Sequence, residues 1–126
     1  MFDTCILHIG LGKTGTTSIQ TAMYLNSVAL ETQSILYPRI SSNHFFLSSC
    51  FDDRPERLLF HMDRGRTSSE ISEFNKAHID WLRDLSLEGS CKTLVLSSEF
   101  LAGLSRSGIG RLKAFLDGIA FYGSVA

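Results

Sequence analysis

Residues 4–18 read TCILHIGLGKTGTTS, and this stretch decides the fold. Residues 4–9 form a short apolar run, which is typical of a strand buried on both faces of a parallel sheet. Glycines mark a turn over residues 10–15, and the hydroxyl residues after it are good helix N-caps. From Ile19 to about Leu30, apolar residues recur at helical spacing. Strand, glycine loop and helix in this order open a nucleotide-binding α/β fold.

Two later segments are further strand candidates. Residues 34–37 (SILY) form a brief apolar segment that a proline ends, and residues 93–96 (TLVL) form a second buried run. Helical segments separate these runs, which predicts right-handed parallel crossovers. We therefore expect one α/β domain over residues 1–126, with a parallel sheet flanked by helices.

Three helical segments are expected in the second half of the chain. The first is a short stretch near residues 56–62. The second is a long amphipathic helix that Ser69 would cap and that Gly89 would end as its C-cap. The third follows Ser107 and runs to about Phe121.

Composition narrows the class of protein. Twelve basic and thirteen acidic residues give a formal charge of -1, which provides no field to attract nucleic acid or an anionic membrane. No apolar run approaches the ~20 residues that cross a bilayer. The cysteines Cys5, Cys50 and Cys91 form no CxxC pair, which is typical of reduced thiols. We expect a cytoplasmic protein without a membrane span and without a nucleic-acid partner.

Three of the histidines are not expected to take part in chemistry. His8 lies in the first strand and His78 on the apolar stripe of the long helix, so both are predicted to pack in the core. His61 has no partner at metal-ligand spacing. Because no HxxxH or CxxC pattern occurs, no metal site is predicted.

The glycine loop has the chemistry of an anion site. A loop at a helix start offers unpaired N–H groups and the positive end of the helix dipole. Glycines let the backbone approach an anion closely, and a lysine adds a mobile positive charge. The expected anion-binding residues are Gly12, Lys13, Thr14, Gly15, Thr16, Thr17 and Ser18.

The order Lys-Thr-Gly-Thr-Thr over residues 13–17 is not a Walker A loop, in which lysine directly follows the last glycine. It resembles the 5′-phosphosulfate loop of sulfotransferases that use 3′-phosphoadenosine 5′-phosphosulfate (PAPS). Residues 7–20 (LHIGLGKTGTTSIQ) are similar to the bacterial sulfotransferase-domain group. Weaker matches follow in the same order at Tyr37-Pro38, at His44 and at residues 94–101 (LVLSSEFL).

The resemblance implies a P-loop-like sheet, PAPS as the sulfate donor, no metal, and transfer of a sulfuryl group to a hydroxyl or amine. It covers most of this chain but only the first part of the family's domain. In the family, the next strand ends in an arginine, followed by a serine, and both hold the donor's 3′-phosphate. This chain reaches Ala126 about where that strand should begin. We therefore expect a truncated sheet, no 3′-phosphate site and doubtful turnover.

Three residues are candidates for catalysis. The resemblance places Lys13 at the bridging and leaving phosphate oxygens. An acceptor needs a base to take its proton, and Glu99 follows a predicted strand end, where open α/β sheets place ligands. Glu99 is either this base, a partner for Lys13, or a carboxylate that only favours the next helix. His44 is the second candidate base, and a solvated loop histidine is an equal alternative for it.

Two other functions remain open from the residues alone. A P-loop kinase or NTPase would need Mg²⁺, with Thr14 after Lys13 and an acidic residue such as Glu99 on a neighbouring strand. A catalytically inactive, shortened sulfotransferase fold would instead pair an open sheet edge with a second copy and form a homodimer. The identity of the acceptor is not readable from the sequence.

Overall fold

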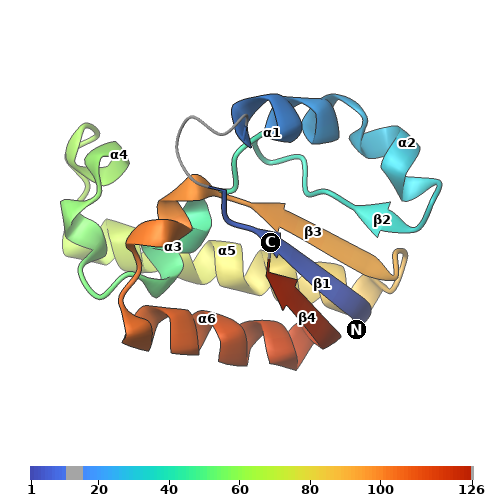
Figure 1. Ribbon diagram of the computed structural model, residues 1–126. Helices are drawn as coiled ribbons and strands as arrows, with labels where there is room; N and C mark the ends of the chain where they lie inside the picture. Colours follow the sequence, from blue (N-terminus) through green and yellow to red (C-terminus); the bar gives the residue numbers. More distant parts are fainter. Residues whose placement is uncertain (11–15, 126) are drawn as a thin grey trace.

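A small parallel sheet forms the centre of the molecule (Figure 1). The computed structural model describes residues 1–10 and 16–125, without the side chains of residues 16 and 121–125. The sheet has four strands in the order β2-β3-β1-β4, and every pairing between them is parallel. The strands are β1 (Phe2–His8), β2 (Ile35–Leu36), β3 (Thr93–Ser97) and β4 (Ala120–Val125). The parallel sheet expected from the apolar runs is therefore confirmed.

The two inner strands carry the centre of the core. Cys5 lies opposite Leu94 and Leu7 opposite Leu96 in the register of β1 and β3, and all four side chains are buried. These four residues lie on one face of the sheet, whereas on the other face Val95 is buried and Ile6 is only half-buried.

Helices α1 (Thr16–Leu25) and α2 (Ser27–Glu31) cover one face of the sheet (Figure 1). The single helix predicted up to Leu30 is wrong at Asn26, where the chain breaks between them. The Asn26 side-chain amide donates to the carbonyl of Ala22 at 2.7 Å. The helical backbone bonds from Asn26 N–H to the Ala22 carbonyl (3.1 Å) and from Leu30 N–H to the Asn26 carbonyl (2.9 Å) remain, so the interruption is a local distortion at Asn26, with φ -101° and ψ 13°.

The other face is covered by α3 (Phe46–Phe51), α5 (Ser68–Glu88) and α6 (Arg106–Ile119) (Figure 1). Short helical turns connect them: η1 (Pro55–Arg57), α4 (Leu59–Met62) and η2 (Glu99–Gly103). The short helical stretch expected near residues 56–62 is thus present as η1 and α4. The sequence did not predict α3.

The ends of the long helix α5 follow capping chemistry. Gly89 takes a left-handed conformation with φ 66° and forms the C-cap, as predicted. Ser69 is not the N-cap. Thr67 takes that position, because its side chain accepts from the Glu70 N–H while the Glu70 carboxylate accepts from the Thr67 N–H. This reciprocal pair satisfies two backbone N–H donors. Ser69 cannot form such a pair, because no carboxylate lies at the matching position.

The last predicted helix starts earlier and ends earlier than expected. Ser105, not Ser107, caps α6 by accepting from the Gly108 N–H at 3.0 Å. The helix ends at Ile119 rather than Phe121, and β4 then pairs with the outer side of β1. Pairing with β1 satisfies backbone groups that a helix extension would leave at an open sheet edge.

The strand order places a switch point between β1 and β3. His8 lies opposite Ser97 at the carboxyl ends of these strands. From there the chain after β1 leads to α1 on one face, and the chain after β3 leads to α6 on the other (Figure 1). In open α/β sheets, ligands bind in the crevice that such diverging connections leave.

Candidate functional site

The candidate site lies at the carboxyl edge of the sheet, between the ends of β1 and β3. After β1 the chain reaches Gly10, whose φ of 62° lies in the left-handed region that favours glycine. Four expected anion-binding residues lie outside the described residues: Gly12, Lys13, Thr14 and Gly15. The backbone of Thr16 begins α1, and Thr17 and Ser18 are exposed in its first turn. This places the N-terminal end of α1 at the switch point.

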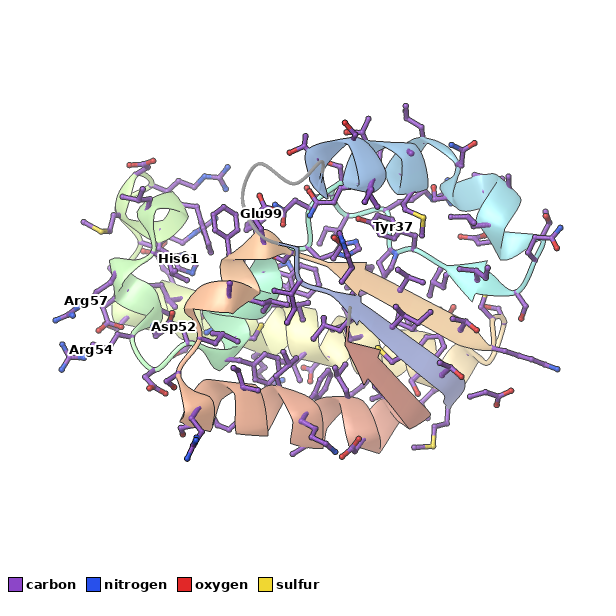
Figure 2. The ribbon with its side chains drawn as sticks, in the orientation of Figure 1. Tyr37, Asp52, Arg54, Arg57, His61 and Glu99 are labelled. Carbon is purple, nitrogen blue, oxygen red and sulfur yellow. The ribbon has the colours of Figure 1, made fainter. Side chains whose placement is uncertain are left out.

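Glu99 lies at the same edge of the sheet, where β3 gives way to η2 (Figure 2). Two amides hold its half-buried carboxylate: Gln20 Nε2 donates to Oε2 at 3.0 Å, and Asn43 Nδ2 donates to Oε1 at 3.1 Å. Each carboxylate oxygen keeps a second lone pair, so Glu99 is oriented and still able to accept a proton.

Gln20 ties the first helix to the sheet. Its side chain is 3% exposed, and Nε2 also lies 3.0 Å from Ser97 Oγ. His8 Nδ1 lies 2.8 Å from the same hydroxyl. His8, Gln20, Asn43, Ser97 and Glu99 together are called the strand-edge network below. Sequence reasoning gave no role to Gln20, a polar residue in the first helix, or to Asn43, in the loop before α3, and no sequence signal marked either of them.

Asn43 contributes an unusual group to this network. Its Oδ1 atom is buried and has no hydrogen-bond partner among the described residues. A buried amide oxygen without a partner costs roughly 1–3 kcal/mol. Such a group in a native structure needs an explanation, and a ligand or an ordered water that donates to Oδ1 would remove this cost.

His44 is not solvated but fully buried at the base of the site. Its Nδ1 accepts from the Ser97 backbone N–H at 2.9 Å, so Nε2 carries the proton and donates to the Pro38 carbonyl at 2.8 Å. Burial lowers the pKa of His44 to about 4, although the bond to Pro38 opposes that shift. Because backbone groups use both ring nitrogens, His44 fixes the chain beneath the site and offers no nitrogen to a substrate.

Tyr37 supports the same loop. It is fully buried, and its hydroxyl donates to the Ser42 carbonyl at 2.5 Å. Its ring lies 4.5 Å from the His44 ring, and burial raises the pKa of its hydroxyl to about 12. Tyr37 is therefore a neutral structural residue that shapes the loop carrying Asn43.

A second polar network lies apart from Glu99, where α3, α4 and α5 meet (Figure 2). The Arg66 guanidinium can only donate, so His61 Nδ1 accepts from Arg66 Nη1 at 2.9 Å. His61 Nε2 then donates to Ser49 Oγ at 2.6 Å, and that hydroxyl donates to Asn75 Oδ1 at 2.5 Å. Ser49, His61, Arg66 and Asn75 are called the helix-joint network below.

The helix-joint network is structural in its geometry. A serine is activated when a histidine accepts its proton, whereas His61 here donates to Ser49. Ser49 and His61 are also almost completely buried. Burial, and then the charges of Arg66 and Arg64, lower the pKa of His61, which keeps the ring neutral.

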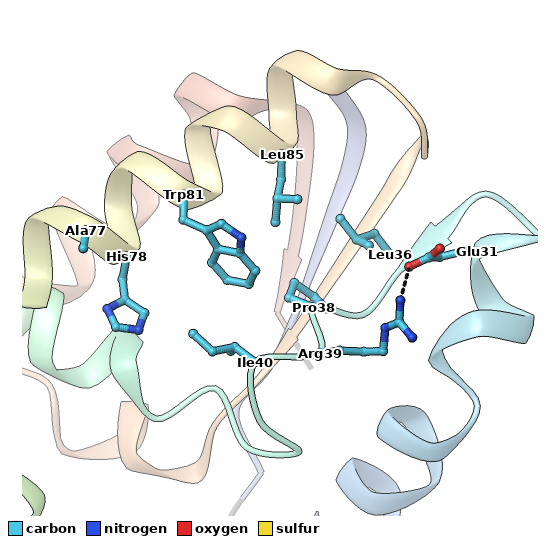
Figure 3. Close-up of a pocket in the computed structure, with 9 residues that line it drawn as sticks. All are labelled: Glu31, Leu36, Pro38, Arg39, Ile40, Ala77, His78, Trp81 and Leu85. Carbon is cyan, nitrogen blue, oxygen red and sulfur yellow. Dashed lines mark ion pairs between the residues drawn. The ribbon is translucent and has the colours of Figure 1, made fainter.

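Two of the cavities lined by described residues are large enough for a small molecule. The larger, of about 620 Å³, lies between α5 and the chain after β2, with Trp81 on one wall and the Arg39–Glu31 ion pair (3.9 Å) on another (Figure 3). None of the strand-edge network lines it. The second, of about 530 Å³, is lined by Asn43 and Phe100, beside Glu99.

The remaining predicted features are placed as follows. His78 packs in a stack on Phe46, with ring centroids 4.8 Å apart, and His8 is half-buried in the strand-edge network. Within residues 1–10 and 16–125, no group of three or more His, Cys, Asp or Glu side chains is arranged to hold a metal ion. No helix of this described part has the length and apolar character needed to span a membrane.

Comparison of the chain with protein-family models, with curated proteins and with solved structures gives no match.

Proposed function

We propose that this chain binds the 5′-phosphosulfate of PAPS at the loop between β1 and α1 and transfers the sulfuryl group to a hydroxyl or amine acceptor. One observation carries the proposal. The strand order brings the carboxyl ends of β1 and β3 together, so the start of α1 and the oriented carboxylate of Glu99 lie at the same edge of the sheet.

The donor half of the proposed site combines backbone and side-chain donors. The N-terminus of α1 supplies unpaired N–H groups and the positive end of a helix dipole. Lys13 adds a cation where negative charge grows on the leaving phosphate, which favours the transition state. Thr17 and Ser18 add exposed hydroxyls in the first turn.

Glu99 is the proposed base. When the acceptor oxygen bonds to sulfur, the bond from sulfur to the donor's phosphate oxygen breaks, and the acceptor proton moves to Glu99. Gln20 and Asn43 hold the carboxylate in place for this transfer. His44, the other candidate base, becomes a positioning residue in this proposal, because backbone groups occupy both of its ring nitrogens.

Ligand-induced stabilisation tests the donor site. Adenosine 3′,5′-bisphosphate at 100 times its Kd should stabilise the protein by about 2.7 kcal/mol, read as a rise in Tm. Lys13→Ala should largely remove this rise, whereas Lys113→Ala, which removes an exposed lysine paired with Asp117 on α6, should not. Stabilisation by Mg-ATP but not by the bisphosphate would favour a P-loop kinase or NTPase and reject the proposal.

The expected lack of a 3′-phosphate site has its own test. Adenosine 5′-monophosphate lacks only the 3′-phosphate of the bisphosphate. If no residue holds that group, the two nucleotides should give equal rises in Tm. A markedly larger rise with the bisphosphate would contradict the expectation and support full donor recognition.

A homodimer through the sheet edge remains part of the proposal. Among the described strands, β4 pairs only with β1, so its other side is a sheet edge that a second copy could extend. Sedimentation velocity should then show twice the monomer mass. A monomer at every concentration tested would remove the dimer and leave the donor site unaffected.

A further inference from the structure

The cavity beside Asn43 has the walls of an aromatic binding site. Its volume of about 530 Å³ lies within the range of small-molecule sites. Phe45 and Phe60 form an edge-to-face pair with centroids 4.9 Å apart, and both line the cavity together with Phe100. Phe100 is 52% exposed, which is a high value for a large apolar side chain beside a polar site.

The cavity is joined to the strand-edge network through one side chain. Asn43 lines it, donates to Glu99 Oε1 at 3.1 Å, and holds a buried Oδ1 without a partner among the described residues. Phe100 directly follows Glu99 in η2. Glu99 itself does not line the cavity, and Asn43 joins the two, so a shift of Asn43 would be needed to bring the hydroxyl of a ligand to the Glu99 carboxylate.

The charges on the cavity wall do not select an ion. Arg57 and Asp63 both line it, and their opposite charges largely offset each other. Figure 2 shows Arg57 pointing away from Glu99, and the side chain is exposed. The rest of the wall is mainly apolar, so a neutral occupant avoids the cost of removing a charge from water.

We propose that the acceptor is a neutral aromatic alcohol, whose ring packs against Phe45, Phe60 and Phe100 and whose hydroxyl points to Asn43 and Glu99. This inference rests on the proposed sulfuryl transfer. The hydroxyl oxygen bonds to sulfur, the bond from sulfur to the donor phosphate breaks, and Glu99 takes the proton. The larger cavity by Trp81 is less suitable, because none of the residues lining it belongs to the strand-edge network.

Two matched ligands test the aromatic requirement without any nucleotide. Binding of 2-naphthol and of its saturated analogue decahydro-2-naphthol is measured by calorimetry on the whole chain. Aromatic pairing predicts that 2-naphthol binds about three- to tenfold more tightly. Equal affinity for both ligands, or no binding of 2-naphthol, overturns the inference.

A variant locates the binding. Phe100→Ala removes an exposed ring and should keep the fold, while the Kd for 2-naphthol rises about three- to tenfold. Leu87→Ala, at an 82% exposed apolar residue on α5, is the matched control and should leave the Kd unchanged. An unchanged Kd in Phe100→Ala, or an equal loss in the control, places the ligand elsewhere and rejects the site.

The two proposals fail separately. If adenosine 3′,5′-bisphosphate stabilises the protein and 2-naphthol does not bind, the acceptor inference is wrong and the donor site stands. If 2-naphthol binds but the nucleotide has no effect, the chain holds an aromatic ligand without sulfuryl transfer, and the inference fails as a statement about an acceptor.

Discussion

The strand-edge network and the helix-joint network each join separate parts of the fold through a histidine, a serine and an asparagine. In the helix-joint network, the Ser49 hydroxyl and both His61 ring nitrogens have partners within the protein. In the strand-edge network, each Glu99 carboxylate oxygen has an unused lone pair, and Asn43 Oδ1 has no partner among the described residues.

This difference teaches how to separate structure from function in similar polar clusters. A network whose bonds are all satisfied internally has nothing to give a ligand, however much its residues look like catalytic ones. A network at a switch point of the sheet whose side chains are oriented but keep unused hydrogen-bonding groups can bind a ligand. The comparison predicts that variants of the first network affect stability and that variants of the second affect activity.

The largest expected effect comes from Glu99→Gln. Loss of the proposed base should lower the rate of sulfuryl transfer at least about 100-fold. Transfer is measured with radiolabelled PAPS and 2-naphthol, beside Glu56→Gln as an exposed carboxylate control. If transfer continues at the original rate while the Tm falls sharply, Glu99 is a structural residue and the assignment of activity to the strand-edge network is wrong.

Ser49→Ala should have the next largest effect, and on stability alone. It leaves the His61 N–H and the Asn75 amide oxygen buried without their partner, which costs about 2 kcal/mol. Urea unfolding measures the loss, with Ser72→Ala on the exposed face of α5 as the control. Reduced nucleotide or naphthol binding at unchanged stability would reverse the assignment of the two networks.

Acid should weaken the fold through His44. The pKa of His44 in the folded chain is about 4, below the ordinary value near 6.5. Between these two pH values, His44 takes up a proton only in the unfolded chain. Stability therefore falls as the pH drops, by about 1.4 kcal/mol between pH 7.5 and 5.5. His61 acts in the same direction, because its pKa is also lowered.

The pH effect is measured by urea unfolding at both pH values. The variant His44→Asn should be less stable at pH 7.5 but should lose less stability on acidification. An unchanged pH slope in this variant would assign the acid sensitivity to other groups.

The smallest effect tests a boundary that the sequence placed wrongly. Thr67→Ala removes the N-cap of α5 and should cost about 1 kcal/mol, whereas Ser69→Ala should cost much less. Thermal unfolding of both variants measures the difference. Equal losses would show that the reciprocal bonds of Thr67 and Glu70 contribute little.

Local patterns were enough to predict the frame of the molecule. The apolar runs at residues 4–9 and 93–96 predicted β1 and β3, and the strand-end rule placed Glu99 at the carboxyl edge of the sheet. These features depend on neighbours in the sequence, which is why the sequence reveals them.

The partners of the site could not be predicted in the same way. Gln20 and Asn43 reach Glu99 across 79 and 56 residues, and no periodic spacing marks them. The bond from Ser49 to Asn75 likewise spans 26 residues. The start of β4 was missed because Ala120 continues a helical pattern, and pairing with a distant strand determines its conformation.

The position of β1 inside the sheet has a consequence for synthesis on the ribosome. Its carboxyl end meets β3 only at Ser97, 89 residues after His8. At about 5–20 residues per second, the ribosome needs roughly 4–18 s to make that stretch. Throughout this time β1 has no neighbouring strand to pair with, so newly made chains should depend on chaperones until β3 emerges.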